Sequence, residues 1–241
     1  MERLHDFPAD DWRLVQKAKG YNFWDDVYVA SIKKCNPSFE WNYNQWLLTN
    51  HGTAILDTDS KCDIYNKYYA GRHYGVLSHQ MELSLDHFAL ANKLDKNNVN
   101  IIINDYGCGQ GFATFVLLEQ ILFNRSKNKS INNINIHLIE PSEKALRRAK
   151  KYIDRVLKYD IRVNKYNIKC IQSTLDSISR SKIYKSKIAR DSSYIKFHLL
   201  SNILDVESVD VRQLCNDISS LYLGDNFFSC NSPDNKRGLD R

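Results

Sequence analysis

The sequence lacks any apolar run long enough to cross a membrane. A spanning helix needs ~18 or more consecutive apolar residues, and polar or charged residues interrupt every apolar stretch of this chain before that length. The opening segment, Met1 to Asp11, is polar and acidic and shows no basic-then-apolar signal pattern. We therefore expect a soluble protein that stays in the cytoplasm and has no membrane partner.

The cysteines form no pattern that indicates a metal site. None belongs to a CxxC pair, and no Cys/His cluster has zinc-finger spacing. Free cysteine behaves mostly as a small apolar residue, so we expect reduced, inert thiols and no metal. The sequence also contains no Ser/His/Asp arrangement with readable spacing. The six cysteines are Cys35, Cys62, Cys108, Cys170, Cys215 and Cys230.

The formal net charge of +6 is concentrated in two stretches. A basic face attracts nucleic acid or another polyanion, so nucleic acid is a candidate partner. The same charges also fit the solvated face of an ordinary helix. The first stretch holds Arg147, Arg148, Lys150, Lys151, Arg155 and Lys158. The second holds Arg180, Lys182, Lys185, Lys187 and Arg190.

The 241 residues divide by pattern into a helical region, 1–96, and an α/β domain, 97–241. All four tryptophans, Trp12, Trp24, Trp41 and Trp46, fall in the first region. Apolar spacings of three and four predict helices there. The expected helices cover 11–19, 22–34, 40–48 and 63–94, the last divided in two by Gly71 or Gly75.

From residue 97 onward, short apolar runs alternate with helical patterns. This alternation predicts βαβ units and a parallel sheet. The expected strands are 100–106, 134–139, 167–172, 194–200 and 226–231. The expected helices are 111–123, a segment starting near Ser142 and running to about 159, and 206–221. Because ligands of such sheets bind beyond the carboxyl ends of the strands, the residues after each strand are the candidate site.

The first strand leads into Gly107-Cys108-Gly109-Gln110-Gly111. Alternating glycines on a strand-to-helix turn let the backbone approach a ligand closely. No Gly-Lys-Ser/Thr ending follows, which excludes a P-loop NTPase. In the dinucleotide pattern GxGxxG, Phe112 stands where the last glycine belongs. Asp105, two residues before Gly107, would repel a pyrophosphate and attract a ligand with a free ammonium group.

The second strand ends in Glu140, followed by Pro141. A carboxylate at this place can accept hydrogen bonds from both hydroxyls of a ribose. This role is shared by dinucleotide and nucleoside ligands, so Glu140 does not choose between them.

These motifs resemble those of the class I S-adenosylmethionine (SAM)-dependent methyltransferases, over roughly residues 97–241. The resemblance implies a Rossmann-like doubly wound sheet that binds SAM as the methyl donor. It implies that Asp105, Gly107, Cys108, Gly109 and Gly111 hold the methionine part of SAM. It further implies that Glu140 and Pro141 hold the ribose, and that Ser173, Thr174 and Leu175 surround the adenine.

The resemblance also places Ser201 and Asn202, after the fourth strand, beside the sulfonium and the methyl acceptor. Asp205 is a candidate general base there, or else a cap of the following helix. Arg72, from the aromatic and basic segment 68–74, is a candidate partner of the SAM carboxylate, or else a surface arginine.

Two departures from the family leave the acceptor open to nucleic acid, protein or a small molecule. The fourth strand is not followed by the Asn/Asp-Pro-Pro-aromatic turn found in enzymes that methylate exocyclic amines of bases. The family's sheet continues past strand five, whereas this sequence stops at Arg241. We expect a sheet shortened after strand five because the sequence is cut short, because the protein is naturally short, or because a protein partner supplies the rest.

Two functions therefore compete, a methyltransferase and a non-catalytic module of the same fold that binds RNA or a protein. A nicotinamide oxidoreductase is disfavoured by Phe112 and Asp105. We expect the helical region 1–96 to cap the carboxyl edge of the sheet and to help select the acceptor, with its aromatic residues stacking on a flat group. Simple packing of those rings is the alternative.

Overall fold

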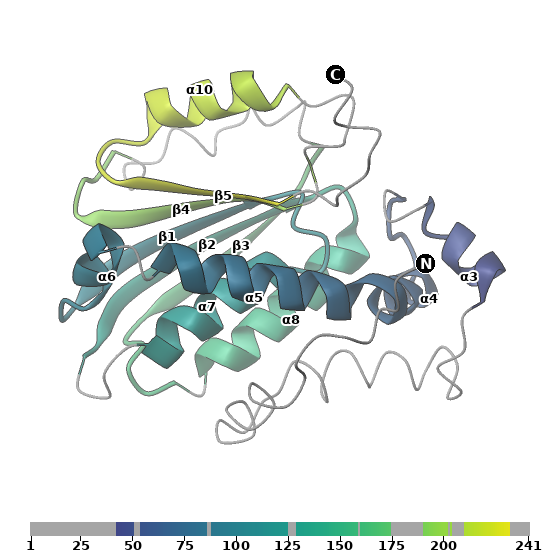
Figure 1. Ribbon diagram of the computed structural model, residues 1–241, viewed down its shortest axis with the longest axis horizontal. Coiled ribbons are helices and arrows are strands. Elements are labelled where there is room, and N and C mark those ends of the chain that lie inside the picture. The colour runs from purple at the N-terminus through teal and green to yellow at the C-terminus, as the bar shows by residue number, and fades with distance from the viewer. Residues whose placement is uncertain are drawn as a thin grey trace.

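The chain folds around a five-stranded parallel sheet (Figure 1). The computed structural model describes residues 42–50, 54–85, 88–124, 129–158, 160–174, 190–201, 203 and 210–231. The strands run in the order β3-β2-β1-β4-β5. They are β1 (Val99–Tyr106), β2 (Ile131–Glu140), β3 (Tyr166–Gln172), β4 (Tyr194–Ser201) and β5 (Asn226–Asn231).

The central strand β1 is buried on both sides because it pairs with β2 and β4 and is covered above and below. Ile103 lies opposite Ile136 of β2 and Phe197 of β4. Because both faces of β1 are covered, the residues of its apolar run follow one another without alternating with polar ones. The strand β3, at the sheet edge, keeps most of its side chains exposed.

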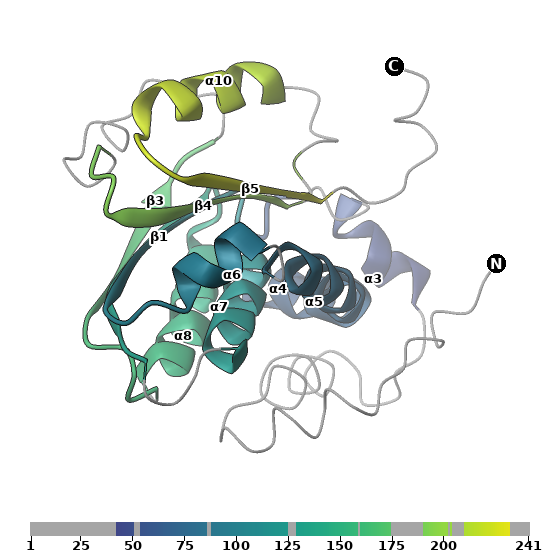
Figure 2. The ribbon, with the colours of Figure 1, turned by 60° about the vertical axis from the view of Figure 1, so that its left-hand side comes forward.

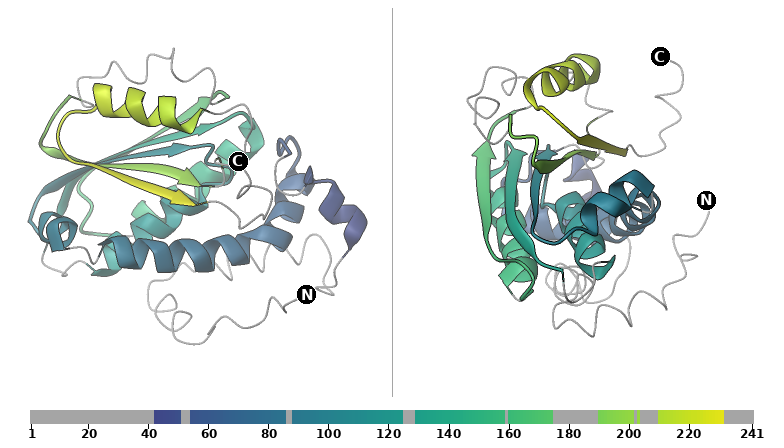
Figure 3. Two further views of the ribbon diagram at one scale, coloured as in Figure 1. Left: turned by 45° about the horizontal axis from the view of Figure 1, so that its top comes forward. Right: turned by 90° about the vertical axis from the view of Figure 1, so that its left-hand side faces the viewer.

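Helices cover both faces of the sheet (Figures 1 and 3). One face carries α5 (Gly71–Leu85), α7 (Phe112–Asn124) and α8 (Glu143–Lys158), and the other carries α10 (Val211–Leu221). Figure 2 shows α10 alone above the sheet and the other helices below it. The fold is a Rossmann-like doubly wound α/β fold, as predicted from the alternation of strands and helices.

Two apolar clusters hold these layers together. The larger lies under α5, α7 and α8 and takes Ile101 and Ile103 from β1 together with Leu77 and Met81 from α5. The smaller lies under α10, where Leu214 and Ile218 pack against Tyr106, Ile139 and Leu200. Val99, Ile101 and Ile103 of β1 belong to the first cluster and Tyr106 to the second, because successive side chains of a strand point to opposite faces of the sheet.

The described part of the N-terminal region is helical. It consists of α3 (Tyr43–Leu47), α4 (Asp59–Tyr65), the π-helix η3 (Asn66–Ala70), α5 and α6 (Phe88–Leu94). Figure 1 shows α3 and α4 on the side toward which β1, β2 and β3 point, whereas α5 runs beside α7. The helices expected at 11–19 and 22–34 lie outside the described residues.

An element boundary lies at Gly71, where the π-helix η3 passes into α5, but the helical backbone is not interrupted there or at Gly75. The helix α5 begins at Gly71, which has right-handed helical angles, and runs through Gly75 to Leu85. Glycine within a helix costs about 1 kcal/mol relative to alanine. Burial of Tyr74, Leu77 and Met81 along the same helix outweighs that cost.

Several other boundaries differ from expectation, and two of them have a clear local cause. The strand β2 begins at Ile131, three residues earlier than predicted, because Ile131 pairs with Val99 and is fully buried. The helix after β4 begins at Val211, not 206, because Asp210 is its N-cap and accepts from the backbone N–H of Gln213 at 2.9 Å. No helix among the described residues has the length and apolar character needed to span a membrane.

Candidate functional site

The glycine loop, residues 107–111, connects β1 to α7 at the carboxyl edge of the sheet. Gly107, Gly109 and Gly111 all have positive φ, at 64°, 51° and 78°. Residues other than glycine rarely adopt these backbone angles, so the loop conformation accounts for the alternating glycines. The amide of Cys108 donates to the carbonyl of Ile139 at 2.9 Å and fixes the loop to the end of β2.

Gly109 and Gly111 have different surroundings. A Cβ atom built on Gly109 would meet no atom of the described residues within 4 Å, so this part of the loop borders open space in the described part of the chain. A Cβ on Gly111 would lie 2.8 Å from the Cβ of Ala149 in α8. Gly111 therefore lets the start of α7 pack against α8, while Gly109 leaves room beside the loop.

Glu140 is held against the glycine loop by two backbone amides. Its Oε2 accepts from the N–H of Gly109 at 3.1 Å, and its Oε1 accepts from the N–H of Ser142 at 3.1 Å. Burial raises the pKa of Glu140, although both hydrogen bonds act to lower it. A carboxylate offers about four acceptor positions, so Glu140 keeps capacity for further donors.

Asp105 lies fully buried beneath the loop. Its Oδ2 accepts from the hydroxyl of Thr114 at 2.7 Å and from the Thr114 N–H at 3.3 Å, which ties it to the first turn of α7. Its Oδ1 has no hydrogen-bond partner among the described residues. Burial raises the pKa of Asp105 to about 7.

The described residues among the other predicted contacts, which follow strands β2, β3 and β4, lie at the same edge of the sheet. The carbonyl of Pro141 accepts from Gln172 at 3.1 Å, and the N–H of Ser173 donates to the carbonyl of Glu140 at 3.3 Å. Thr174 is exposed, and the buried hydroxyl of Ser201 finds no partner among the described residues. Leu175, Asn202 and Asp205 lie outside those residues.

Arg72 is exposed in the first turn of α5, and no hydrogen bond or ion pair joins it to the loop in the part of the chain that is described. His73, beside it, lies in a cluster of tilted aromatic rings. The ring of Tyr69 lies 5.0 Å from that of Tyr65 and 6.0 Å from that of His73, and Nδ1 of His73 lies 3.3 Å from the Tyr65 hydroxyl. Burial lowers the pKa of His73 to about 4.

Gln110 makes a contact that sequence reasoning missed. Its side chain turns away from the open space and donates to Asn66 Oδ1 at 2.6 Å and to the carbonyl of Cys62 at 3.0 Å. The glycine loop is thereby bonded to η3 and α4. No spacing rule connects residues 44 positions apart, so the sequence carried no signal for this pair.

The first basic stretch lies along α8, but not all of it faces solvent. Arg148 turns inward and binds Asp59 at 3.0 Å as well as Asp63. Arg147, Lys150, Lys151 and Lys158 are exposed. Of the second stretch only Arg190 is described, and it is exposed.

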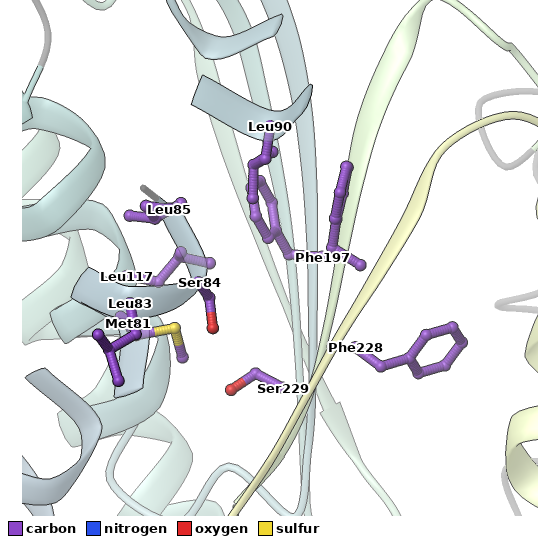
Figure 4. Close-up of a pocket in the computed structure, with 10 residues that line it drawn as sticks. Met81, Leu83, Ser84, Leu85, Leu90, Leu117, Phe197, Phe228 and Ser229 are labelled. Carbon is purple, nitrogen blue, oxygen red and sulfur yellow. The ribbon is translucent and has the colours of Figure 1, made fainter. Parts of the chain in front are cut away.

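A separate apolar cavity of about 420 Å³ lies between α5 and the strands β4 and β5 (Figure 4). Met81, Leu117 and Phe197 line it. Figure 4 shows Ser229 pointing into this space and Phe228 pointing away from it. The Ser229 hydroxyl is buried and has no partner among the described residues.

No group of three or more His, Cys, Asp or Glu side chains in the described ranges is placed to hold a metal ion. In comparisons with known proteins, no family model matches the chain and no curated protein matches it either.

Proposed function

We propose that this chain binds SAM at the carboxyl edge of its sheet and transfers the methyl group to an acceptor. The observation that carries this proposal is the surroundings of Gly109. Open space borders the loop there, and the carboxylate of Glu140 is held against the loop by the Gly109 amide. A ligand in this space would contact the backbone of Gly109 and the carboxylate of Glu140, which can accept hydrogen bonds from ribose hydroxyls.

Buried polar atoms without partners support the same site. Asp105 Oδ1 and Ser201 Oγ have none among the described residues, and both lie near the carboxyl ends of neighbouring strands. Buried polar groups are nearly always hydrogen-bonded, so an unpaired one calls for an explanation such as a ligand. An ammonium group would supply the donor that Asp105 Oδ1 lacks.

Each predicted site residue would have a separate role in binding SAM. Glu140 would accept from the ribose hydroxyls, Asp105 would attract the ammonium group, and Ser173 and Thr174 would border the adenine. SAM supplies a methyl group on a leaving group that is already activated. The protein's contribution is then mainly to hold the acceptor in line with that methyl group. Correct orientation alone can accelerate such a transfer strongly.

Calorimetry with the demethylated product, S-adenosylhomocysteine, tests the site. Glu140→Ala should weaken binding by ~1.5–3 kcal/mol, the range for hydrogen bonds to a charged group. Glu143→Ala is the matched control, because Glu143 is an exposed residue that pairs with Arg147. Equal effects of the two substitutions, or no binding to the unmodified protein, would contradict the proposal. Transfer of tritium from labelled SAM into fractionated RNA, DNA, protein and metabolites would then identify the acceptor.

A second candidate function is the binding of nucleic acid by the outer face of α8. Seven of its sixteen residues are Lys or Arg and two are acidic. The apolar side chains of Ala145, Ala149 and Ile153 are buried on the inner face, which segregates the exposed cations on the other. Such a face attracts phosphates without reading sequence.

Fluorescence anisotropy with labelled single-stranded RNA and duplex DNA tests this second function over a range of salt concentrations. The double reversal Lys150→Glu/Lys151→Glu should weaken binding and reduce its salt dependence. Lys93→Glu/Lys96→Glu, on α6 and the turn after it, changes the net charge equally and should have a smaller effect. An affinity that does not change with salt concentration, or that both double variants weaken equally, would exclude α8 as the nucleic-acid contact.

A further inference from the structure

A polar network crosses the sheet on the face covered by α10. It joins side chains from four strands to the residue that ends α10. Its members are His137 of β2, Asn104 and Tyr106 of β1, His198 of β4, Asn226 of β5 and Tyr222. Asn104, Tyr106 and His198 are completely buried.

The hydrogen bonds of Asn226 assign the protons of His198. The amide nitrogen of Asn226 donates to the backbone carbonyls of Tyr222 at 3.0 Å and Gly224 at 3.1 Å. Its oxygen therefore faces Nε2 of His198, at 3.1 Å, as an acceptor. Nε2 must carry the hydrogen. Burial lowers the pKa of His198 to about 4, so the ring is neutral at pH 7 and Nδ1 is an acceptor.

The remaining bonds are consistent with this assignment. Nδ1 of His198 lies 3.2 Å from the hydroxyl of Tyr106 and 3.4 Å from the amide nitrogen of Asn104, both of which can donate to it. The oxygen of Asn104 in turn accepts from the Tyr222 hydroxyl at 3.3 Å and from Nδ1 of His137 at 2.7 Å. The Tyr106 hydroxyl is the nearer of the two donors that share the single lone pair of His198 Nδ1, and a buried network bonded in this way is rigid.

The network reaches the glycine loop through Tyr106. Tyr106 is the last residue of β1, and Gly107 follows it directly. Its ring stacks on that of His198, with centroids 6.1 Å apart and planes 18° from parallel. Glycine-rich backbone has the most conformational freedom to lose, so a loop of this kind depends on fixed residues at its ends.

We propose that Tyr106 and His198 are positioning residues that hold the glycine loop in its ligand-binding conformation. The hydrogen bond fixes the side chain of Tyr106, and the fixed side chain sets the direction in which the backbone enters Gly107. As a statement about ligand binding this rests on the proposed function. As a statement about loop order it stands by itself, and the test separates the two.

The matched pair is Tyr106→Phe against Tyr222→Phe. Each removes one buried hydroxyl from the same network, but only Tyr106 adjoins the loop. Hydrogen exchange of the loop amides, such as those of Cys108 and Gly109, reads loop order without any ligand. Tyr106→Phe should speed their exchange about fivefold, the change expected for one neutral hydrogen bond, and Tyr222→Phe should not. Exchange that stays slow in Tyr106→Phe, or that rises equally in both variants, overturns the proposal.

Calorimetry with S-adenosylhomocysteine gives the second reading. If the unmodified protein binds it, Tyr106→Phe should lose about fivefold in affinity, and unchanged affinity would count against positioning. If the unmodified protein does not bind it, the proposed function fails, while the exchange data still decide the role of Tyr106.

A second pair of variants covers the case in which Tyr106→Phe does not fold. His198→Asn places an amide oxygen near the position of Nδ1, so it keeps an acceptor for the Tyr106 hydroxyl and should retain slow exchange of the loop amides. His198→Leu removes the acceptor, so the loop amides should exchange faster. Fast exchange in His198→Asn, or slow exchange in His198→Leu, would overturn the proposal.

Discussion

Gln110 donates a hydrogen bond to Oδ1 of Asn66 across 2.6 Å and joins the glycine loop to the π-helix η3. Both side chains are buried, with exposed fractions of 1% and 0%. Gln110 stands between Gly109 and Gly111, so its hydrogen bond restrains a segment in which the glycines leave the backbone much conformational freedom. Two helices of the N-terminal region, α4 and η3, therefore contact the glycine loop of the candidate site directly.

We expect Gln110→Ala to lower the free energy of unfolding by ~1–3 kcal/mol, because it leaves Asn66 buried without this donor. Urea unfolding measures the change. Gln80→Ala is the control, since Gln80 makes an exposed bond to the carbonyl of Cys230, and it should cost less than ~0.5 kcal/mol. The double variant with Asn66→Ala should cost less than the sum of the two single changes. Strict additivity would show that the two side chains are not coupled.

Alanine at Gly109 should mainly weaken ligand binding, whereas alanine at Gly111 should mainly lower stability. Both positions have positive φ, so each change costs about 1 kcal/mol in backbone strain. At Gly111 the new methyl group also collides with Ala149 at 2.8 Å, and stability should fall further. At Gly109 it enters open space, so the protein should fold but bind S-adenosylhomocysteine at least tenfold more weakly. Thermal melts and calorimetry on both variants check this pattern, and normal affinity in Gly109→Ala would contradict the placement of the ligand.

The sequence predicted the strands and the alternation well because these depend on local patterns. The runs ending at Tyr106, at Glu140 and at Ser201 are apolar, and all became buried strands. Their order in the sheet follows from the fold class. The polar pair Asn132 and Asn133 hid the start of β2, because the first residues of this strand are less buried than its middle and can be polar.

The supports of the site could not be predicted because they join residues far apart in the chain. Tyr106 and His198 are separated by 92 positions and Gln110 and Asn66 by 44. In the sequence His198 reads as one polar residue in a buried strand. Its partners emerge only when β1, β4 and β5 are placed side by side, and no periodicity encodes that placement.

Replacing Ser229 with alanine should stabilise the protein. Its hydroxyl is buried in the apolar cavity beneath α5 without a partner among the described residues, and an unsatisfied buried polar group costs ~1–3 kcal/mol. Ser229→Ala should therefore raise the free energy of unfolding by about 1 kcal/mol. Ser84→Ala, at the same cavity, is the control, because the Ser84 hydroxyl already donates to the carbonyl of Gln80 at 2.8 Å. A destabilised Ser229→Ala variant would mean that the hydroxyl has a partner.

The buried carboxyl of Asp105 links pH to both stability and binding. Its pKa in the folded protein, about 7, lies above the ordinary value of 3.8, mainly because burial disfavours the charged form. Between these two values the folded state binds a proton that the unfolded state has released. Stability from this group is therefore greatest at low pH and is lost as the pH rises toward 7.

Binding should show the opposite trend, because an ammonium group prefers the ionised carboxylate. We expect the affinity for S-adenosylhomocysteine to fall by up to about tenfold per pH unit below pH 7 and to level off above it. Calorimetry in two buffers of different ionisation enthalpy should detect a proton released on binding at pH 6.5. Asp105→Asn should abolish the proton release and weaken binding, while raising the melting temperature at pH 8 because no charge is then buried. Thr114→Ser, which keeps a hydroxyl beside Asp105, is the control and should preserve the pH profile. An affinity that does not change between pH 6 and 8 would remove Asp105 from the ligand site.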